Sequence, residues 1–201
     1  MFFRVFVVCL VLAASYALFE IWRAHAFYSR MHNPPSAFTV MNDDGDVAVV
    51  DFLNYECNAC KSTNKLLLEQ ARSNKDIKLV IRPVPYEGKA IENDVKMVLA
   101  AGLQGKFWEL HEAIIHYEDT PDEKFFKETA ALYDIDYNKM LADSEGLTVQ
   151  DIMKSNATAA YNLGVTTTPA ILVGKSFYAP KAILTLPELL RMIQFEKTGK
   201  E

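Results

Sequence analysis

Two cysteines separated by two residues constrain this chain more than any other feature. Cys57 and Cys60 come shortly after an apolar run, Val47 to Leu53, which a single acid, Asp51, interrupts. Such a run predicts a strand buried on both faces, because no polar alternation marks a solvent side. The following segment, 57–72, has the apolar spacing of a helix. The cysteine pair is therefore expected between a buried strand and the first turn of a helix.

This position predicts different roles for the two cysteines. Residues three apart in a first helical turn share a face, so the two sulfurs can reach bonding distance. Cys57 is expected at the helix N-terminus, where free N–H groups and the helix dipole favour a thiolate. Cys60 lies one turn deeper and is expected to be shielded. We predict a nucleophile at Cys57 and a resolving thiol at Cys60, with half of a zinc site or a stable structural disulfide as alternatives.

The rest of the pattern predicts an α/β fold interrupted by helices. Residues 77–81 form a second strand, and a strand–helix–strand unit of this length implies parallel pairing. Residues 91–163 have helical spacing, with a capping box predicted at 120–123. Strands at 168–174 and 176–178 follow, and a second capping box at 185–188 opens a last helix. The order is βαβ, a helical block, then ββα.

Asp51, Thr168 and Pro169 complete the candidate site. A carboxylate within an apolar strand is costly to bury. Asp51 is therefore predicted as a buried acid that relays the proton of Cys60, or else as an acid on a strand edge or a helix cap. Pro169, at the start of a strand, tolerates its missing N–H. We predict a cis-proline turn whose backbone groups pair with a substrate strand near the cysteines, with a bare turn as the alternative.

The first 36 residues differ from the rest of the chain. Arg4 precedes fifteen residues without a charge, Val5 to Phe19, which predicts an export signal within residues 1–22. The segment is either an uncleaved membrane anchor or a cleaved signal peptide, and a buried core helix is the remaining alternative. Residues 23–36, which end in Asn33-Pro34-Pro35-Ser36, are predicted to be a tether. Export would bring the cysteines into an oxidising compartment.

Composition excludes several classes of function. The net charge is −5 and no block of basic residues occurs, so nucleic acid is not an expected partner. Three cysteines are too few for a disulfide-stapled scaffold, and Cys9 lies inside the N-terminal run. No metal or cofactor is expected, because the four histidines are scattered; His111 is predicted to be structural or exposed. Phe107 and Trp108, at helical spacing, are predicted to belong to the core.

Residues 38–198 resemble a DsbA-like thiol–disulfide oxidoreductase, a thioredoxin fold with an inserted helical domain. The resemblance rests on residues 49–52 (VVDF) ahead of the cysteine pair, on 105–111 (GKFWELH) and on 164–170 (GVTTTPA). With this fold, we expect a thioredoxin-like domain made of residues 37–88 and 164–201, and a helical insert at 89–163.

The resemblance also implies roles and partners. It implies that Cys57 attacks or is attacked, that Cys60 resolves, that Asp51 is the buried acid, and that Thr168 and cis-Pro169 face the disulfide. The implied partners are exported proteins with free thiols or disulfides, and a membrane quinone-linked reoxidant. The implied compartment is the periplasm or its equivalent, with residues 5–22 in the inner membrane if they are not cleaved.

The chain departs from the family between the cysteines. Oxidising members commonly carry Pro-His or Pro-Tyr there, whereas this chain has Asn58-Ala59. Without a histidine to stabilise the Cys57 thiolate, the reduced form is less favoured and a milder oxidant is expected. The predicted function is an oxidase that introduces disulfides into folding proteins. The alternatives are a reductase or isomerase of the same fold, and a non-redox tethered chaperone or peptide-binding module.

Overall fold

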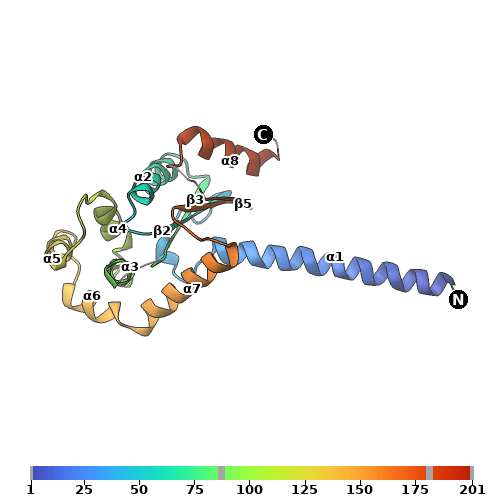
Figure 1. Cartoon of the computed structure of the whole chain (residues 1–201), viewed down its shortest axis with the longest axis horizontal. Coiled ribbons are helices and arrows are strands. Elements are labelled where there is room, and N and C mark those ends of the chain that lie inside the picture. The colour runs from blue at the N-terminus through green and yellow to red at the C-terminus, as the bar shows by residue number, and fades with distance from the viewer. Residues whose placement is uncertain (1, 86–88, 180–182, 200–201) are drawn as a thin grey trace.

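A mixed five-stranded sheet in the order β1-β3-β2-β4-β5 organises the chain (Figure 1). The computed structural model describes residues 2–85, 89–179 and 183–199. The strands are β1 (Val40–Met41), β2 (Val47–Leu53), β3 (Ile77–Pro83), β4 (Ala170–Val173) and β5 (Ser176–Tyr178). The predicted parallel pairing of β2 and β3 and the hairpin of β4 and β5 are confirmed. The short edge strand β1, antiparallel to β3, was not predicted.

Helices cover both faces of the sheet, which explains why β2 shows no polar alternation. On one face lie α2 (Asn58–Ser73) and α8 (Leu186–Thr198); on the other lie α7 (Leu147–Leu163) and the last turn of α1 (Phe2–His32) (Figure 1). Val49 of β2 belongs to the first apolar cluster and Val50 to the second. All seven residues of β2 are buried. The fold is the predicted α/β class.

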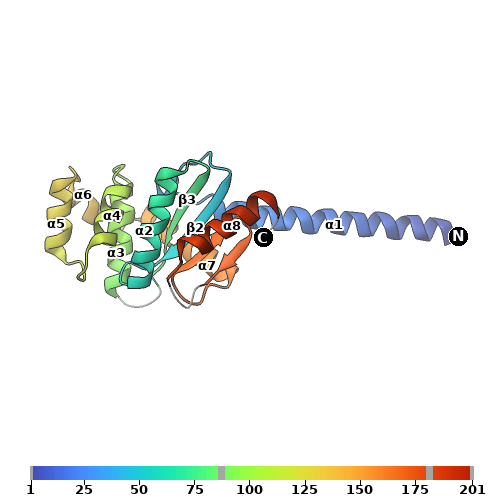
Figure 2. The ribbon, with the colours of Figure 1, turned by 90° about the horizontal axis from the view of Figure 1, so that it is seen from above.

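The helical block follows β3 in the chain and returns to the sheet through α7. Its other members are α3 (Lys89–Gly102), α4 (Phe107–His116), α5 (Glu123–Leu132) and α6 (Tyr137–Ser144), and a 3-10 turn, η1 (Ala37–Thr39), lies against α4. Figure 2 shows α4, α5 and α6 at the end of the domain far from α1. Phe107 is buried in the apolar cluster shared by the sheet and this block, with Trp108 half-buried against it, as predicted.

The two predicted capping boxes have different outcomes. The box at the start of α8 is confirmed, because Thr185 and Glu188 exchange both hydrogen bonds. The box predicted at 120–123 is wrong. The N-cap of α5 is Asp122, whose carboxylate accepts a hydrogen bond from the N–H of Phe125. An aspartate is a stronger N-cap than a threonine two residues earlier would be, so the helix begins later than predicted.

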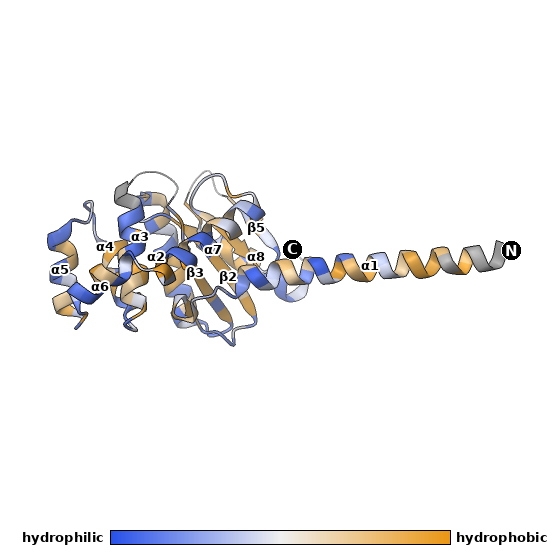
Figure 3. Cartoon of the chain, turned by 90° about the horizontal axis from the view of Figure 1, so that it is seen from below, coloured by the Kyte–Doolittle hydropathy of each residue, from blue (hydrophilic) through white to orange (hydrophobic). Residues whose placement is uncertain are grey.

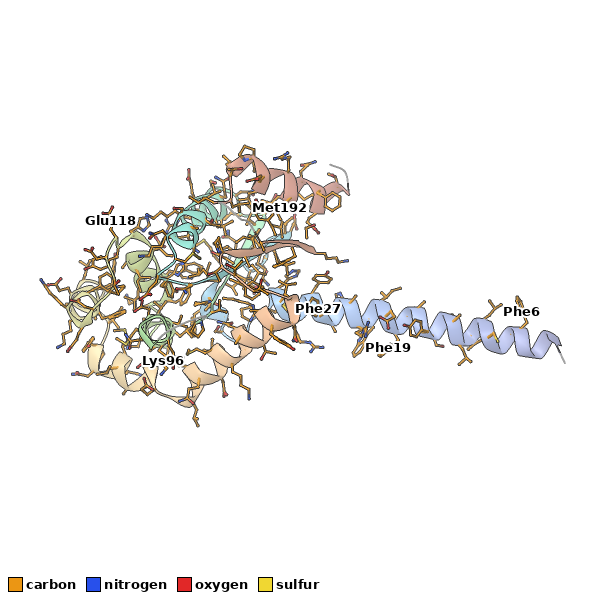
Figure 4. All side chains as sticks on the ribbon, viewed as in Figure 1. Phe6, Phe19, Phe27, Lys96, Glu118 and Met192 are labelled. Atoms are coloured by element: carbon orange, nitrogen blue, oxygen red, sulfur yellow. A yellow bond between two sulfur atoms is a disulfide. The ribbon has the colours of Figure 1, made fainter. Side chains whose placement is uncertain are left out.

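The N-terminal helix is longer than the sequence suggests. The predicted tether, residues 23–36, is helical as far as His32, and Met31 in the last turn is buried against the sheet. Figures 1 and 2 show the rest of α1 projecting away from the domain. Figure 4 places Phe6 and Phe19 on this projecting part, and Phe27 where the helix meets the domain. The helix ends only at the Asn33-Pro34-Pro35 segment, since proline cannot continue it.

A buried arginine of β3 holds the end of α1. The Arg82 guanidinium donates through Nε to the carbonyl of Met31 at 3.1 Å and through Nη2 to that of Arg30 at 2.6 Å. Its Nη1 donates to Asn156 Oδ1 of α7 at 3.1 Å. The last carbonyls of a helix have no partners within it. Arg82 supplies those partners and so fixes the end of α1 to the sheet.

Apolar residues occupy much of the projecting part of α1, which is mostly orange in Figure 3. The exposed members are Phe6, Val7, Leu10, Val11, Leu12, Tyr16, Leu18, Phe19, Ile21 and Trp22. The side chains of residues 1–5 and of Val8, which form part of the predicted export segment, lie outside the described residues. Within the described ranges, no helix combines the length and apolar character needed to cross a membrane.

Replacing Arg82 with Met should loosen α1, because the carbonyls of Arg30 and Met31 lose their donors. We expect the free energy of unfolding, measured in urea, to fall by about 2–4 kcal/mol. Trypsin should also cut faster after Arg30. The control is Arg72→Met, which removes an exposed ion pair with Glu112 and should cost less than about 1 kcal/mol. Equal losses in the two variants would contradict the role assigned to Arg82.

Candidate active site

Cys57 and Cys60 form a disulfide at the start of α2, with their Cα atoms 5.1 Å apart. Cys57 is the N-cap of the helix, and its Sγ accepts a hydrogen bond from the N–H of Cys60 at 3.1 Å. Cys57 is partly exposed, whereas Cys60 is fully buried. A thiolate that arrives from solvent therefore meets Cys57 Sγ first. Both positions agree with those expected from the sequence; the chemical roles of the two sulfurs stay predictions.

The turn before β4 lies beside the disulfide. The Thr168–Pro169 peptide bond is cis, and the carbonyl oxygen of Thr168 lies 3.7 Å from Cys57 Sγ. Pro169 is buried, while Thr166 and Thr167 are exposed immediately before the strand begins. The structure thus brings together residues that are 111 positions apart in the sequence. An exposed backbone next to a reactive sulfur can pair with an extended peptide.

Asp51 is a buried acid in the middle of the sheet. Because β2 lies between β3 and β4, the alternative of an exposed strand edge is excluded. Its Oδ2 accepts a hydrogen bond from Asn64 Nδ2 at 2.8 Å, and its Oδ1 has no partner within the described chain. Burial raises the pKa of the Asp51 carboxyl to about 7, and the hydrogen bond from Asn64 opposes this rise. Both protonation states are therefore accessible near neutral pH.

Two further buried side chains extend from Asn64 into the helical block. His111 Nε2 lies 3.0 Å from Asn64 Oδ1, and His111 Nδ1 lies 2.9 Å from the hydroxyl of Tyr55. Burial lowers the pKa of His111 to about 3, so the imidazole is neutral at neutral pH. His111 is thus buried and hydrogen-bonded rather than exposed, and the sequence did not reveal its partners. A histidine at helical spacing with the buried residues Phe107 and Ile114 was the available signal.

A second polar group that sequence reasoning missed lies near the disulfide. Lys61, the residue after Cys60, is buried and donates from Nζ to the carbonyl of Tyr117 at 2.6 Å. Burial lowers the pKa of its ammonium. Asp94 of α3 is also buried, and burial together with the nearby Glu56 raises its pKa to about 7, while the charge of Lys61 opposes the rise. Lys61 and Asp94 are therefore a second set of buried ionisable groups close to the start of α2.

The dipeptide between the cysteines places no basic side chain in the first turn of α2. Asn58 is exposed and Ala59 is partly exposed. Neither side chain can carry a positive charge towards Cys57. The donor that the structure gives to Cys57 Sγ is the backbone N–H of Cys60. Stabilisation of a Cys57 thiolate therefore depends on the helix terminus rather than on a neighbouring cation.

Comparison with known proteins is consistent with this geometry. The family model described as Thioredoxin matches residues 38–193. A thioredoxin-like oxidoreductase from Silicibacter pomeroyi DSS-3 is 24% identical, with a TM-score of 0.77 over 84% of this chain and 96% of that one. A periplasmic thioredoxin-like protein from Salmonella enterica serovar Typhimurium is 17% identical, with a TM-score of 0.70 over 85% and 95%. The thiol-disulfide exchange protein alpha-DsbA2 from Wolbachia pipientis is 20% identical, with a TM-score of 0.72 over 86% and 96%.

No curated protein matches the chain at a significant level. The similar structures confirm the fold that the resemblance to DsbA-like proteins predicted, a thioredoxin sheet with helices between its two halves.

Replacing Asp51 with Asn should stabilise the oxidised protein in a pH-dependent way. The carboxyl pKa is 3.8 in its reference state and about 7 in the fold, so the unfolded chain loses its proton first as pH rises. The contribution of Asp51 to stability therefore falls between about pH 4 and pH 7 and stays low above that. We expect Asp51→Asn to raise the free energy of unfolding by roughly 2–4 kcal/mol at about pH 8, with almost no gain at about pH 4.

Urea unfolding at the two pH values measures this difference. Asp44→Asn, at an exposed position, is the control and should show no such gap. A gain from Asp51→Asn that is the same at both pH values would contradict the raised pKa.

Proposed function

Because this chain belongs to the thioredoxin family, we propose that it is a protein thiol–disulfide oxidoreductase that donates its Cys57–Cys60 disulfide to folding proteins. The asymmetry of the disulfide carries the proposal: one sulfur is accessible at a helix N-terminus and the other is buried behind it. A stable structural disulfide would not need an exposed sulfur beside an open peptide-binding turn. A short loop between the cysteines also contributes little to stability by chain entropy.

The reaction follows from the exposure of the two sulfurs. A substrate thiolate attacks Cys57 Sγ, the bond between Cys57 and Cys60 breaks, and Cys60 leaves as a thiolate. Asp51, in its protonated form, gives its proton to this thiolate. A second substrate thiolate attacks the substrate sulfur of the mixed disulfide, and Cys57 leaves as a thiolate that the N–H of Cys60 stabilises. Two electrons thus pass from the substrate dithiol to the cysteine pair.

The substrate is proposed to bind as an extended segment beside Thr168 and Pro169. Thr166 and Thr167 are exposed and precede β4, so their backbone groups can pair with a peptide strand. The position of the Thr168 carbonyl next to Cys57 Sγ then aligns the bound segment with the reactive sulfur. Such main-chain pairing is independent of side chains, which suits an enzyme that acts on many proteins.

We propose oxidation rather than isomerisation or reduction as the working direction, because export would bring the cysteine pair into an oxidising compartment, and we expect a mild oxidant. Asn58 and Ala59 provide no cation to stabilise a Cys57 thiolate, so the reduced form gains only the helix-terminus contribution. The reduced pair must be reoxidised, and a membrane quinone-linked protein is the proposed reoxidant. A reductase or isomerase would refold a protein with scrambled disulfides efficiently while oxidising a reduced peptide poorly.

We propose that the protein is exported, for two reasons. The N-terminal segment has the pattern of an export signal, and the reaction needs an oxidising environment. The proposed compartment is the periplasm or its equivalent, with residues 5–22 as an inner-membrane tether if the segment is not cleaved. The exposed apolar residues of α1 support contact with a lipid environment. Cell fractionation with N-terminal sequencing tests both points: a cytoplasmic protein would refute export, and a mature N-terminus beyond residue 22 would refute the tether.

Cys60→Ser should trap substrates. In this variant the Cys57 thiolate forms a mixed disulfide by attacking a disulfide of a substrate, which releases the other substrate sulfur as a thiolate. No Cys60 thiol is present to displace the substrate from Cys57, so we expect covalent complexes that disappear on adding a reductant. These complexes are measured on non-reducing gels after expression in the native compartment. Cys57→Ser is the matched control and should trap far less, because Cys60 is buried. Equal trapping by the two variants would refute the assignment of Cys57 as the attacked sulfur, and full function of the double variant would favour a non-redox role.

Ala59→His should make the protein a stronger oxidant. An imidazolium in the first turn of α2 would stabilise the Cys57 thiolate and so favour the reduced form. We expect the reduction potential, measured by equilibration with glutathione, to rise by about 30–60 mV, which corresponds to roughly 1.4–3 kcal/mol. Ala59→Gln is similar in size but uncharged and should change the potential by much less. A potential that does not respond to the histidine would show that charge next to Cys57 does not limit its oxidising power.

A further inference from the structure

A chain of buried hydrogen bonds runs from Asp51 into the helical block, and the disulfide exchange steps above leave three of its members without a role. Asn64 Nδ2 donates to Asp51 Oδ2 at 2.8 Å. His111 Nε2 lies 3.0 Å from Asn64 Oδ1, and His111 Nδ1 lies 2.9 Å from the Tyr55 hydroxyl. All four side chains are fully buried, and they come from β2, the segment after it, α2 and α4.

The direction of each bond in this chain is determined by the charge at one end. An ionised Asp51 can only accept, so Asn64 must turn its amide nitrogen towards it and its oxygen towards His111. Asn64 Oδ1 can only accept as well, so the proton of the neutral imidazole must be on Nε2. Nδ1 then accepts from the hydroxyl of Tyr55. All the hydrogen bonds in this series therefore run in one direction, and the series ends with the amide N–H of Asn64 donating to the Asp51 carboxylate.

The position of Asn64 connects this chain to the cysteine pair. Asn64 follows Cys60 by four residues in α2, so the two side chains lie on the same face of the helix, one turn apart. Both are fully buried, and Asn64 contacts Asp51 directly. The carboxylate therefore lies under the face of α2 that carries the resolving thiol.

We propose that Asn64 and His111 are positioning residues that keep the Asp51 carboxylate hydrogen-bonded and available as the proton acceptor of Cys60 when a mixed disulfide at Cys57 is resolved. The proposal rests on the proposed function. The Cys60 thiol gives its proton to Asp51, and the thiolate attacks Cys57 Sγ. The bond between Cys57 and the bound sulfur breaks, and the bound group leaves as a thiolate. His111 acts through Asn64, because its N–H donates to Asn64 Oδ1 and so helps to hold the amide with its nitrogen towards Asp51.

The surroundings of Asp51 explain why the single hydrogen bond from Asn64 has an effect on its ionisation. Neighbours in the sheet are Ile81 of β3 and Ile171 of β4, which offer no charge. Arg82 pairs with Phe52 and so faces the opposite side of the sheet, where it holds α1. The ionisable groups on the side of Asp51 include Cys60, Tyr55 and the neutral His111, with Asp94 of α3 close enough to Tyr55 to raise its pKa. Lys61 of α2 donates to the carbonyl of Tyr117, and its charge acts on Asp94.

The charged side chains of α8, the last helix that packs on β2, bind partners other than Asp51. Glu188 bonds to Thr185, Glu196 to Ser176 and Lys197 to Asp76, and Arg191 donates to a carbonyl of its own helix. Among the described residues, no cation shifts the pKa of Asp51: burial raises it, and the hydrogen bond from Asn64 opposes the rise. Removing that bond should move the ionisation of Asp51 to higher pH.

Reaction of the reduced full-length protein with oxidised glutathione separates the two chemical steps. Attack by Cys57 forms a mixed disulfide with glutathione, and attack by Cys60 then releases reduced glutathione as the protein disulfide closes. Rapid acid quenching and mass spectrometry follow both species over a range of pH. The variants are Asn64→Leu, which removes the donor to Asp51, and Thr63→Val as the matched control. Thr63 is a fully buried neighbour on the same helix whose hydroxyl has no hydrogen-bond partner within the described chain.

The proposal predicts a change in the second step only. In Asn64→Leu, release of glutathione should slow about fivefold near pH 7 and about tenfold at about pH 6, with its inflection about one pH unit higher, because the rate below the inflection follows the ionised fraction of Asp51. Formation of the mixed disulfide should stay within about twofold of wild type. Thr63→Val should change neither step. An unshifted inflection in Asn64→Leu would overturn the proposal, whereas failure of the wild-type protein to form any mixed disulfide would refute the proposed function itself.

Two further measurements test His111. His111→Phe removes the N–H donor and should raise the inflection, while His111→Gln retains a donor towards Asn64 and should restore most of the wild-type profile. Equal profiles in both variants would overturn the role of His111. Nitrogen NMR of the reduced wild-type protein needs no variant: the imidazole should carry its proton on Nε2 from about pH 8 to about pH 9, where Asp51 is ionised. A proton on Nδ1 at any pH in that range would contradict the polarity of the chain.

Discussion

The burial of β2 on both faces is the constraint on which the rest of the site depends. β2 lies between β3 and β4, and helices cover both of its faces. The chain therefore leaves the sheet at the end of β2, which leads directly to Cys57 at the start of α2. The antiparallel pairing of Phe52 with Ala170 brings the beginning of β4 to the same edge. Thr168 and Pro169 immediately precede Ala170, so they must lie beside the disulfide. Strand pairing thus assembles a site from two distant parts of the chain.

Burial also explains how the fold treats its polar side chains. A polar group inside a protein is costly unless it has hydrogen-bond partners. Arg82 has three partners and holds the end of α1, which is a structural use of a buried charge. Asp51 has one partner and an oxygen without any within the described residues, so its two protonation states are close in free energy. A carboxyl group whose two protonation states have similar free energies can exchange a proton during a reaction.

The sequence predicted the sheet connections and the cysteine positions because local patterns carry them. Six apolar positions around Asp51, a CxxC pair and a helical period are sufficient to indicate a strand, a helix start and a redox pair. The end of α1 was not predictable in the same way. Asn33-Pro34-Pro35 indicates where a helix must stop, but the donors of Arg82, about fifty residues later, are what hold the preceding turn. Similarly, Asp122 rather than Thr120 caps α5, a choice between two good N-caps that local pattern alone did not resolve.

The sequence by itself determined the chemistry that is available: two sulfurs three residues apart, an acid in an apolar strand, a proline before another, and no histidine between the cysteines. The tertiary structure alone decided which groups surround that chemistry. Asn64 and His111 are ordinary residues of helical segments in the sequence. They join Asp51 in one series of hydrogen bonds only because α2 packs on the sheet and α4 packs on α2. Hydrogen bonds between distant side chains depend on packing in three dimensions, and no local periodicity records them.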